Sequence, residues 1–352
     1  MIPRIGIAAL LFGLSAFTAA GRAQLEPSPD APPVSHAPAL PPDETPVATF
    51  KQTVNLVELF FTVKDNKGNL VPHLNKDVCS VSEDKVPQTL KSFVAETNQP
   101  LTLGILLDTS GSQERVLPLE QQVGSQFLEQ VLRSKDEAFL LSFDVNVDLL
   151  QDFTNNPRLL AHAMDKAQIN TAGGNGAGGI PGLGGGTVPI YGDPKGTLLY
   201  DAIYLAATEK LNKETGRKAM IILTDGEDEG SHTKIEEAIG AAERNNVIVY
   251  VILLADRAFY GGFGYSGYSA ARKISDETGG RLIDVGNNGN KLQAAFQQIQ
   301  DELRTQYVAT YTPSNTKQDG TFRHLAVECK GDNGQTLKVQ VRKGYYAPSP
   351  GS

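Results

Sequence analysis

The sequence predicts an α/β fold with a doubly wound, mostly parallel sheet that carries helices on both faces. From about residue 100 to 305, apolar runs alternate with amphipathic stretches, which is typical of buried parallel strands and their covering helices. The flanks, residues 50–99 and 306–348, instead show short alternating strands and turns without a long helical pattern. Because a few strands need a partner layer, we expect both flanks to form one β-sandwich in which the α/β domain is inserted.

The elements follow from the spacing of apolar residues. Continuous apolar runs predict strands, and apolar residues three and four positions apart predict helices. In the central domain, strands are expected at 102–108, 137–144, 219–225, 247–254 and 281–285, and helices at 118–134, 155–167, 197–211, 233–245, 271–280 and 290–306. In the flanks, strands and turns are expected at 54–74, 78–96, 306–313, 322–330 and 337–346.

The N-terminal region predicts export. Residues 1–23 combine an arginine, a short apolar core and small residues, which is typical of a secretory signal peptide; the alternative, a membrane anchor, needs a slightly longer core. Residues 24–49 are rich in proline and poor in large apolar side chains, so we expect a disordered linker. The mature chain should then be soluble, without an integral membrane segment, and periplasmic or secreted. Cys79 and Cys329 can pair in such a chain, although two buried free thiols are equally compatible with the sequence.

Charge and histidine content exclude several functions. The formal net charge is −8 and no cluster of lysine and arginine stands out, which argues against binding to nucleic acid or to anionic membranes. The five histidines are scattered without zinc-ligand spacing, and the HExxH motif is absent.

Two polar motifs stand at the carboxyl ends of expected strands. DTSGS, residues 108–112, follows the first parallel strand, and TDGEDEG, residues 224–230, follows the third. Thr197 begins a helix after a glycine-rich stretch. In a doubly wound sheet these loops can meet at one edge, where ligand sites lie. The resulting pocket would be lined by oxygen atoms of Asp108, Ser110, Ser112, Thr197 and Asp225, which suits Mg²⁺, Ca²⁺ or Mn²⁺ and gives little to zinc or copper.

DTSGS matches the D-x-S-x-S signature of von Willebrand factor A domains, and Thr197 and Asp225 fall where that family's other ligands fall. Residues 100–305 resemble such a domain, and the flanks are similar to those of exported VWFA-related proteins of acidobacteria. The resemblance implies a metal-ion-dependent adhesion site (MIDAS) with these five ligands, most simply for Mg²⁺, and a protein partner that offers an Asp or Glu carboxylate. Two departures are the glycine-rich insertion before Thr197, which affects how open the site is, and Gln113 after the last serine.

The sequence gives less support to an enzymatic function than to a binding function. A phosphatase of the haloacid dehalogenase type needs a second aspartate where Ser110 stands, and a serine hydrolase needs a histidine base, for which His162 and His232 qualify only by residue type. We therefore expect a non-enzymatic binding protein. The rivals are a structural or assembly protein with a purely stabilising metal and a metal-dependent hydrolase. Glu227 and Asp228 are expected in a solvated acidic turn, and the glycine-rich segments 172–196 and 259–270 in surface loops.

Overall fold

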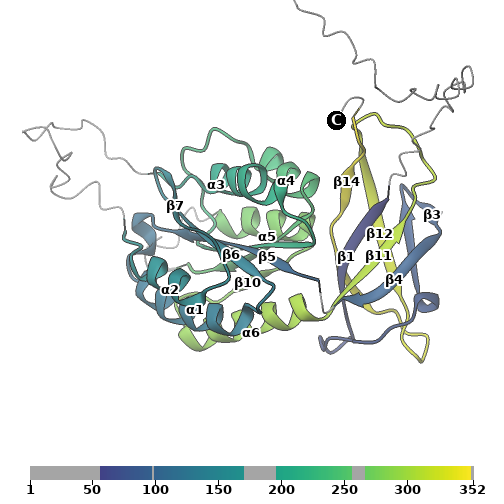
Figure 1. Ribbon diagram of the computed structural model, residues 1–352, viewed down its shortest axis with the longest axis horizontal. Helices are drawn as coiled ribbons and strands as arrows, with labels where there is room; N and C mark the ends of the chain where they lie inside the picture. Colours follow the sequence, from purple (N-terminus) through teal and green to yellow (C-terminus); the bar gives the residue numbers. More distant parts are fainter. Residues whose placement is uncertain (1–55, 97–98, 170–195, 256–265, 350–352) are drawn as a thin grey trace, which may run out of the picture. The chain divides into compact units, whose positions relative to one another are not determined.

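The computed structural model describes residues 56–96, 99–169, 196–255 and 266–349. The expected signal peptide and linker, and most of the two glycine-rich segments, lie outside the described residues. Among the described helices, none is long and apolar enough to cross a membrane. Figure 1 shows an α/β module and a module of antiparallel strands.

A six-stranded sheet forms the centre of the α/β module, with the strand order β10-β9-β8-β5-β6-β7. Neighbouring strands are parallel except for β6 and β7, which are antiparallel. Every residue of β5 and β9 is buried because layers cover both faces. The predicted doubly wound, mostly parallel sheet is thus confirmed. The strands are β5 (Leu101–Asp108), β6 (Glu137–Phe143), β7 (Val147–Thr154), β8 (Arg217–Thr224), β9 (Val247–Leu253) and β10 (Leu282–Asp284).

Helices cover both faces of this sheet (Figure 1). On one face, α1, α2 and α6 share a core with Leu103, Ile105 and Leu107 of β5. On the other, α3, α4 and α5 share a core with Leu106, since successive side chains of a strand point to opposite faces. The helices are α1 (Leu117–Val131), α2 (Pro157–Asp165), α3 (Leu199–Leu205), α4 (Ile235–Arg244), α5 (Gly267–Thr278) and α6 (Gly289–Arg304).

The edge strand β7 is missing from the sequence prediction. None of its residues is buried, so the apolar periodicity that marks the other strands is weak there. A tight turn produces it: the Asp144 side chain accepts a hydrogen bond from the backbone N–H of Asn146 at 3.0 Å, and the backbone of Asp144 donates to Asn146 at 2.9 Å. This turn also places Asp144 at the carboxyl edge of the sheet.

The flanks form a β-sandwich of two antiparallel four-stranded sheets, β13-β1-β11-β4 and β14-β12-β2-β3. Each sheet contains strands from both flanks, and the two sheets share one apolar core that includes Phe61, Val81, Tyr307 and Val327. The predicted composite sandwich is therefore confirmed. Its strands are β1 (Val57–Lys64), β2 (Cys79–Glu83), β3 (Val86–Gln88), β4 (Leu90–Glu96), β11 (Gln306–Tyr311), β12 (Phe322–Cys329), β13 (Lys338–Val341) and β14 (Gly344–Tyr346).

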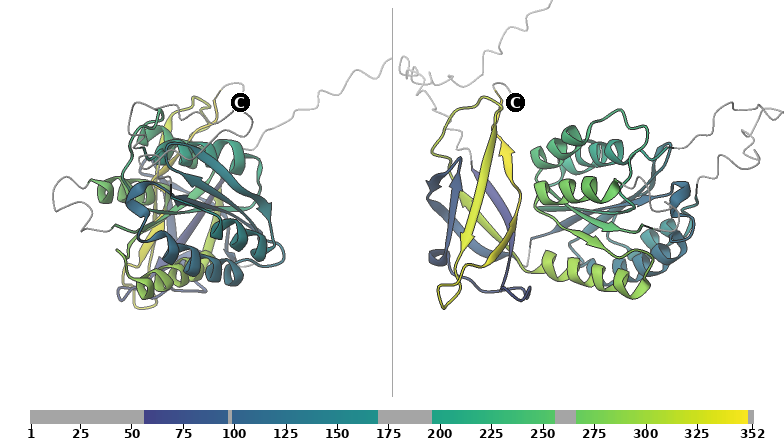
Figure 2. Two further views of the ribbon diagram at one scale, coloured as in Figure 1. Left: turned by 90° about the vertical axis from the view of Figure 1, so that its left-hand side faces the viewer. Right: turned by 180° about the vertical axis from the view of Figure 1, so that it is seen from behind.

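Two links join segments that are distant in sequence. A disulfide joins Cys79 of β2 to Cys329 of β12, which face each other in the antiparallel register. The guanidinium of Arg217 donates to the backbone oxygen of Gln99 at 2.8 Å and to that of Leu303. Arg217 therefore holds together the two places where the chain enters and leaves the α/β module. Figure 2 shows α6 leading directly into β11.

Candidate functional site

The DTSGS loop wraps around the carboxylate of Asp108, the last residue of β5. Asp108 is fully buried. Its Oδ1 accepts hydrogen bonds from the backbone N–H of Ser110 at 3.0 Å and from the Ser110 hydroxyl at 2.6 Å. The hydroxyl oxygens of Ser110 and Ser112 are 3.1 Å apart. The structure thus brings the three predicted groups of the first loop together in one cluster.

The TDG motif reaches the same cluster because β8 is the parallel neighbour of β5. Thr224, at the end of β8, donates its hydroxyl hydrogen to Asp108 Oδ2 at 2.6 Å. Asp225 is also buried, and its Oδ1 accepts from the backbone N–H of Glu227 at 3.1 Å. Gly226 has φ +84°, and a Cβ there would lie 2.5 Å from the backbone oxygen of Gly267, so only glycine fits this turn.

Thr197 is tied to the same edge through its backbone. It forms an antiparallel bridge with Glu229, in the loop that follows Asp225, with N···O distances of 2.9 and 3.0 Å. Leu198 N–H donates to the backbone oxygen of Asp144 at 2.8 Å, while Thr109 of the first loop donates its hydroxyl hydrogen to Asp144 Oδ2 at 2.9 Å. Asp144 therefore connects the first and second loops, and Glu229 connects the second and third.

The carboxyl groups of the cluster are buried away from water, which disfavours their charged forms. Burial, with a further contribution from the charge of Asp225, raises the pKa of the Asp108 carboxyl to about 7, although hydrogen bonds from Ser110 and Thr224 act in the opposite direction. Burial raises the pKa of the Glu120 carboxyl on α1 as well, and the charges of Asp108 and Asp225 add to this effect. Three carboxyl groups therefore influence one another at this edge of the sheet.

Glu120 and Gln113 carry buried polar atoms that are not satisfied within the described part of the chain. Neither carboxylate oxygen of Glu120 has a hydrogen-bond partner there, nor has Oε1 of Gln113. Such atoms are rare in folded proteins because leaving them unmatched costs about 1–3 kcal/mol each. Buried carboxylates with unsatisfied oxygens beside hydroxyl groups match the oxygen ligands of a hard divalent cation. The residues present therefore fit a cation of that kind.

The kinds of side chain at this edge of the sheet determine which cation they can bind. Among the described residues, no group of three or more His, Cys, Asp or Glu side chains is arranged to hold a metal ion. A site here would consist of the two aspartates and neutral hydroxyl groups, a composition that suits Mg²⁺, Ca²⁺ or Mn²⁺ better than zinc or copper.

Sequence reasoning overlooked several residues of the site. Thr224 lies inside the TDG motif but was not assigned a role, although it binds Asp108 directly. Glu120 could have been noticed because it stands three residues after Leu117 and three before Val123, on the buried face of α1. Asp144 could not have been found without the hairpin that positions it.

The expected solvated acidic turn is only partly right. Glu227 accepts hydrogen bonds from the backbone N–H groups of Ser266, at 2.5 Å, and Gly267, at 2.8 Å, at the start of α5. Asp228 accepts from the backbone N–H of Tyr200 at 3.0 Å and from the hydroxyl of Ser231 at 2.6 Å. Both side chains therefore fix the loops around the site, rather than only facing water.

The two histidines considered as bases lie on the surface. His162 is exposed on α2, and the side chain of His232 is 96% exposed, with Nδ1 3.5 Å from Asp201 Oδ2. Neither forms a hydrogen bond with a serine of the DTSGS loop within the described residues.

No family model and no curated protein matches the chain. Similar solved structures include BatB of Bacteroides thetaiotaomicron (18% identity, TM-score 0.42, covering 58% of this chain and 99% of that one). A von Willebrand factor type A protein of Catenulispora acidiphila is 10% identical (TM-score 0.45, covering 86% and 76%). Proximal thread matrix protein 1 of the mussel byssus, with a zinc-occupied MIDAS motif, is 15% identical (TM-score 0.44, covering 63% and 49%). This chain thus spans about half of that last protein.

The order of the sheet and the placement of DTSGS, Thr197 and TDG at its carboxyl edge decide the fold. The α/β module has the fold of a von Willebrand factor A domain. The strand order of this chain itself supports that fold. A fold shared at identities of 10–18% does not imply a shared function.

Proposed function

We propose that this protein is an exported, non-enzymatic binding module that recognises an acidic group of a protein partner through a divalent cation. The ligands would be Asp108, Ser110, Ser112, Thr197 and Asp225, as in a MIDAS. The observation that carries the proposal is the cluster of buried Asp108 and Asp225 with hydroxyl groups, at a sheet edge where three loops are tied together.

Charge balance supports the proposal. Two aspartates neutralise a divalent cation, and hydroxyl ligands complete its shell without adding charge. A bound cation would supply an open position that accepts one carboxylate oxygen of the partner. Mg²⁺ is the first choice, with Ca²⁺ and Mn²⁺ as alternatives. The hydroxyls of Ser110 and Thr224 donate hydrogen bonds to the two carboxylate oxygens of Asp108 and so keep this side chain oriented.

A non-enzymatic role is favoured by the surroundings of the cluster. Ser110 stands where a phosphatase of the dehalogenase type would need its acid/base aspartate. His162 and His232 lie at the surface, and among the described residues no histidine forms a hydrogen bond with a serine of the first loop. A hydrolase would be supported instead by turnover of ester or phosphoester substrates that is lost in Asp108→Ala.

The first test is binding of Mg²⁺, Ca²⁺ and Mn²⁺, measured by calorimetry on the mature chain. Asp225→Asn should abolish binding, whereas Asp148→Asn, an exposed aspartate of β7, should leave it unchanged. Equal loss in both variants, or no binding to the unsubstituted protein, would refute the metal site.

A second measurement separates recognition from simple stabilisation. With Mn²⁺ bound, water on the ion accelerates the relaxation of solvent protons, and a carboxylate that replaces this water reduces the effect. Added acetate should therefore lower the relaxation rate of the Mn²⁺-loaded protein. An unchanged rate at saturating acetate would favour the rival in which the metal only stabilises the fold.

A further inference from the structure

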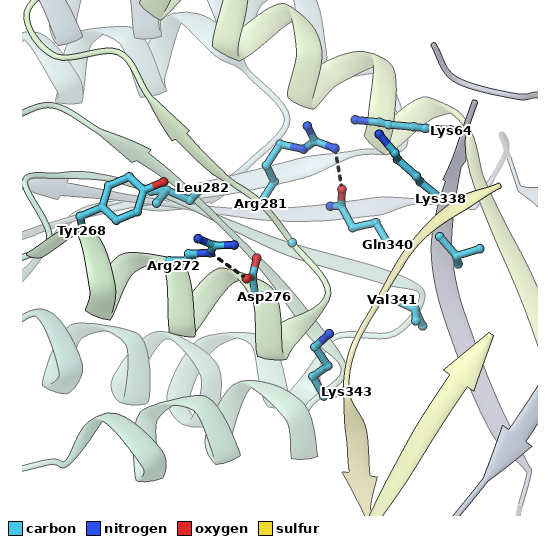
Figure 3. Close-up of a pocket in the computed structure, with 12 residues that line it drawn as sticks. Lys64, Tyr268, Arg272, Asp276, Arg281, Leu282, Lys338, Gln340, Val341 and Lys343 are labelled. Atoms are coloured by element: carbon cyan, nitrogen blue, oxygen red, sulfur yellow. Dashed lines mark hydrogen bonds and ion pairs between the residues drawn. The ribbon is translucent and has the colours of Figure 1, made fainter. Parts of the chain in front are cut away.

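A second polar pocket lies between β13, β1 and the segment from α5 to β10 (Figure 3). Its volume is about 490 Å³, within the roughly 300–1,000 Å³ range of small-molecule sites. It is distinct from the candidate metal site, because Gly280 and Arg281 precede β10 and so lie at the amino end of that strand. Its cationic lining residues are Lys64, Arg272, Arg281, Lys338 and Lys343.

The positive charge of this pocket is only partly neutralised. Lys64 and Arg281 share the buried carboxylate of Glu302, at 2.5 and 3.1 Å. Arg272 pairs with Asp276 at 3.4 Å. Five cations against these two carboxylates leave a surplus of three positive charges, in a chain whose formal net charge is −8.

Two of these three surplus charges belong to exposed lysines of the sandwich. Within the described part of the chain, neither Lys338 nor Lys343 forms an ion pair. In Figure 3, the side chains of Lys338 and Lys64 extend from the sandwich toward the pocket, and that of Lys343 extends toward it from another direction. The lysines thus converge on a space that the α/β module closes from the opposite side with Arg272 and Arg281.

Hydrogen bonds hold the floor of the pocket in place. Arg281 Nη2 donates to Gln340 Oε1 at 2.9 Å, and Gln340 Nε2 donates to the backbone oxygen of Gly279 at 3.2 Å. The backbones approach closely here, since a Cβ on Gly279, at φ +85°, would lie 2.4 Å from Arg342 N. A charged group bound here would therefore meet an Arg281 guanidinium that is positioned in advance.

We propose that this pocket binds a small multivalent oxyanion of the phosphate class, such as pyrophosphate or a phosphate ester. Arginine forks and lysine point charges are the side chains that bind phosphate oxygens. A recess of this volume suits a soluble small anion better than a membrane surface, and the overall negative charge disfavours nucleic acid. The proposal does not depend on a cation at the DTSGS loop.

Pyrophosphate is the probe, titrated calorimetrically into the mature chain at low ionic strength with EDTA present, so that a cation at Asp108 cannot contribute. The expected result is one site per chain, with affinity that falls as salt rises. The double variant Lys338→Gln/Lys343→Gln should weaken binding about tenfold or more. The matched control is Lys317→Gln/Lys330→Gln, which removes the same charge from exposed lysines of the sandwich outside the pocket.

Three outcomes would overturn the proposal: absence of pyrophosphate binding, equal weakening in both double variants, or unchanged affinity in Lys338→Gln/Lys343→Gln. Equal weakening would mean that the net charge of the sandwich, and not this pocket, attracts the anion. Thermal midpoints of both double variants, measured without ligand, verify that each remains folded.

Discussion

The raised pKa of Asp108 makes the effect of a divalent cation depend on pH in a defined direction. Without a cation, this buried carboxyl group titrates at about 7, against 3.8 for the ordinary group. A carboxyl group whose pKa is raised by folding does not affect stability below its ordinary pKa. It destabilises the fold increasingly as pH rises toward the folded value. At about 1.4 kcal/mol per pH unit, the free energy of unfolding should lose on the order of 4 kcal/mol between pH 4 and 7.

A cation favours the charged carboxylate and removes this loss. The stabilisation by Mg²⁺ should therefore grow from pH 5 to pH 7 and level off above, with apparent affinity changing roughly tenfold per pH unit below 7. The assay is urea unfolding at pH 5, 6, 7 and 8, in EDTA and in saturating Mg²⁺. Asp108→Asn is the reference variant, because it removes the titrating group while keeping nearly the same shape.

The decisive quantity is the difference between the unsubstituted protein and Asp108→Asn in EDTA, since groups away from this cluster of carboxyl groups titrate equally in both. Relative to that of Asp108→Asn, the free energy of unfolding of the unsubstituted protein should fall by several kcal/mol as pH rises from 5 to 8. A difference that stays constant with pH would refute the inference that a cation binds the buried Asp108 carboxylate. Stabilisation by Mg²⁺ that increases toward pH 5 would refute it as well.

Four further outcomes follow from single contacts. Glu120→Gln should stabilise the cation-free protein by about 1–2 kcal/mol at pH 8 and have little effect at pH 4, because it removes a buried carboxylate that has no hydrogen-bond partner within the described residues; a pH-independent effect in urea unfolding would contradict this. Gly226→Ala should destabilise by about 1–3 kcal/mol through its positive φ and the contact with Gly267, whereas Gly111→Ala, where a Cβ meets nothing within 4 Å, should be nearly neutral in the same assay. Cys79→Ser/Cys329→Ser should lower the unfolding free energy by about 2–5 kcal/mol, and a thermal midpoint equal to that of the intact protein would argue against the bond. Glu302→Gln should cost about 3–5 kcal/mol because it leaves the cations of Lys64 and Arg281 without their shared carboxylate, and pyrophosphate should restore more stability to this variant than to the unsubstituted protein; equal restoration would separate Glu302 from the pocket.

Much of the architecture could be predicted because the central strands are apolar throughout. Strands such as 247–253, buried at every position, read as continuous apolar runs that only a sheet covered on both faces explains. The meeting of the DTSGS and TDG loops could be predicted for a related reason, since a parallel sheet gathers the carboxyl ends of its strands at one edge. The edge strand β7 could not be predicted, because a strand without buried residues carries little periodicity.

The hydrogen bonds that connect the loops around the site could not be predicted from the sequence. Asp228 reaches Tyr200 across 28 positions, and Asp144 reaches Thr109 across 35. These pairs depend on how far each loop extends beyond its strand, which local residue types do not determine. Glu120 differs, since a carboxylate on an otherwise buried helix face conflicts with the local pattern and can be noticed as an exception.

The net charge of the chain does not reveal its two local sites of opposite charge. A value of −8 argues correctly against a generally basic surface, yet it averages over two local sites of opposite sign. The carboxylates gather at the carboxyl ends of the parallel strands, whereas the cations near residues 64, 272, 281, 338 and 343 meet beside the start of β10. These five positions fall in three stretches of the chain, residue 64, residues 272–281 and residues 338–343, so no short window of the sequence contains them together. Because Coulomb interactions depend on distance in space, the composition of a chain can exclude a basic protein but not a basic pocket.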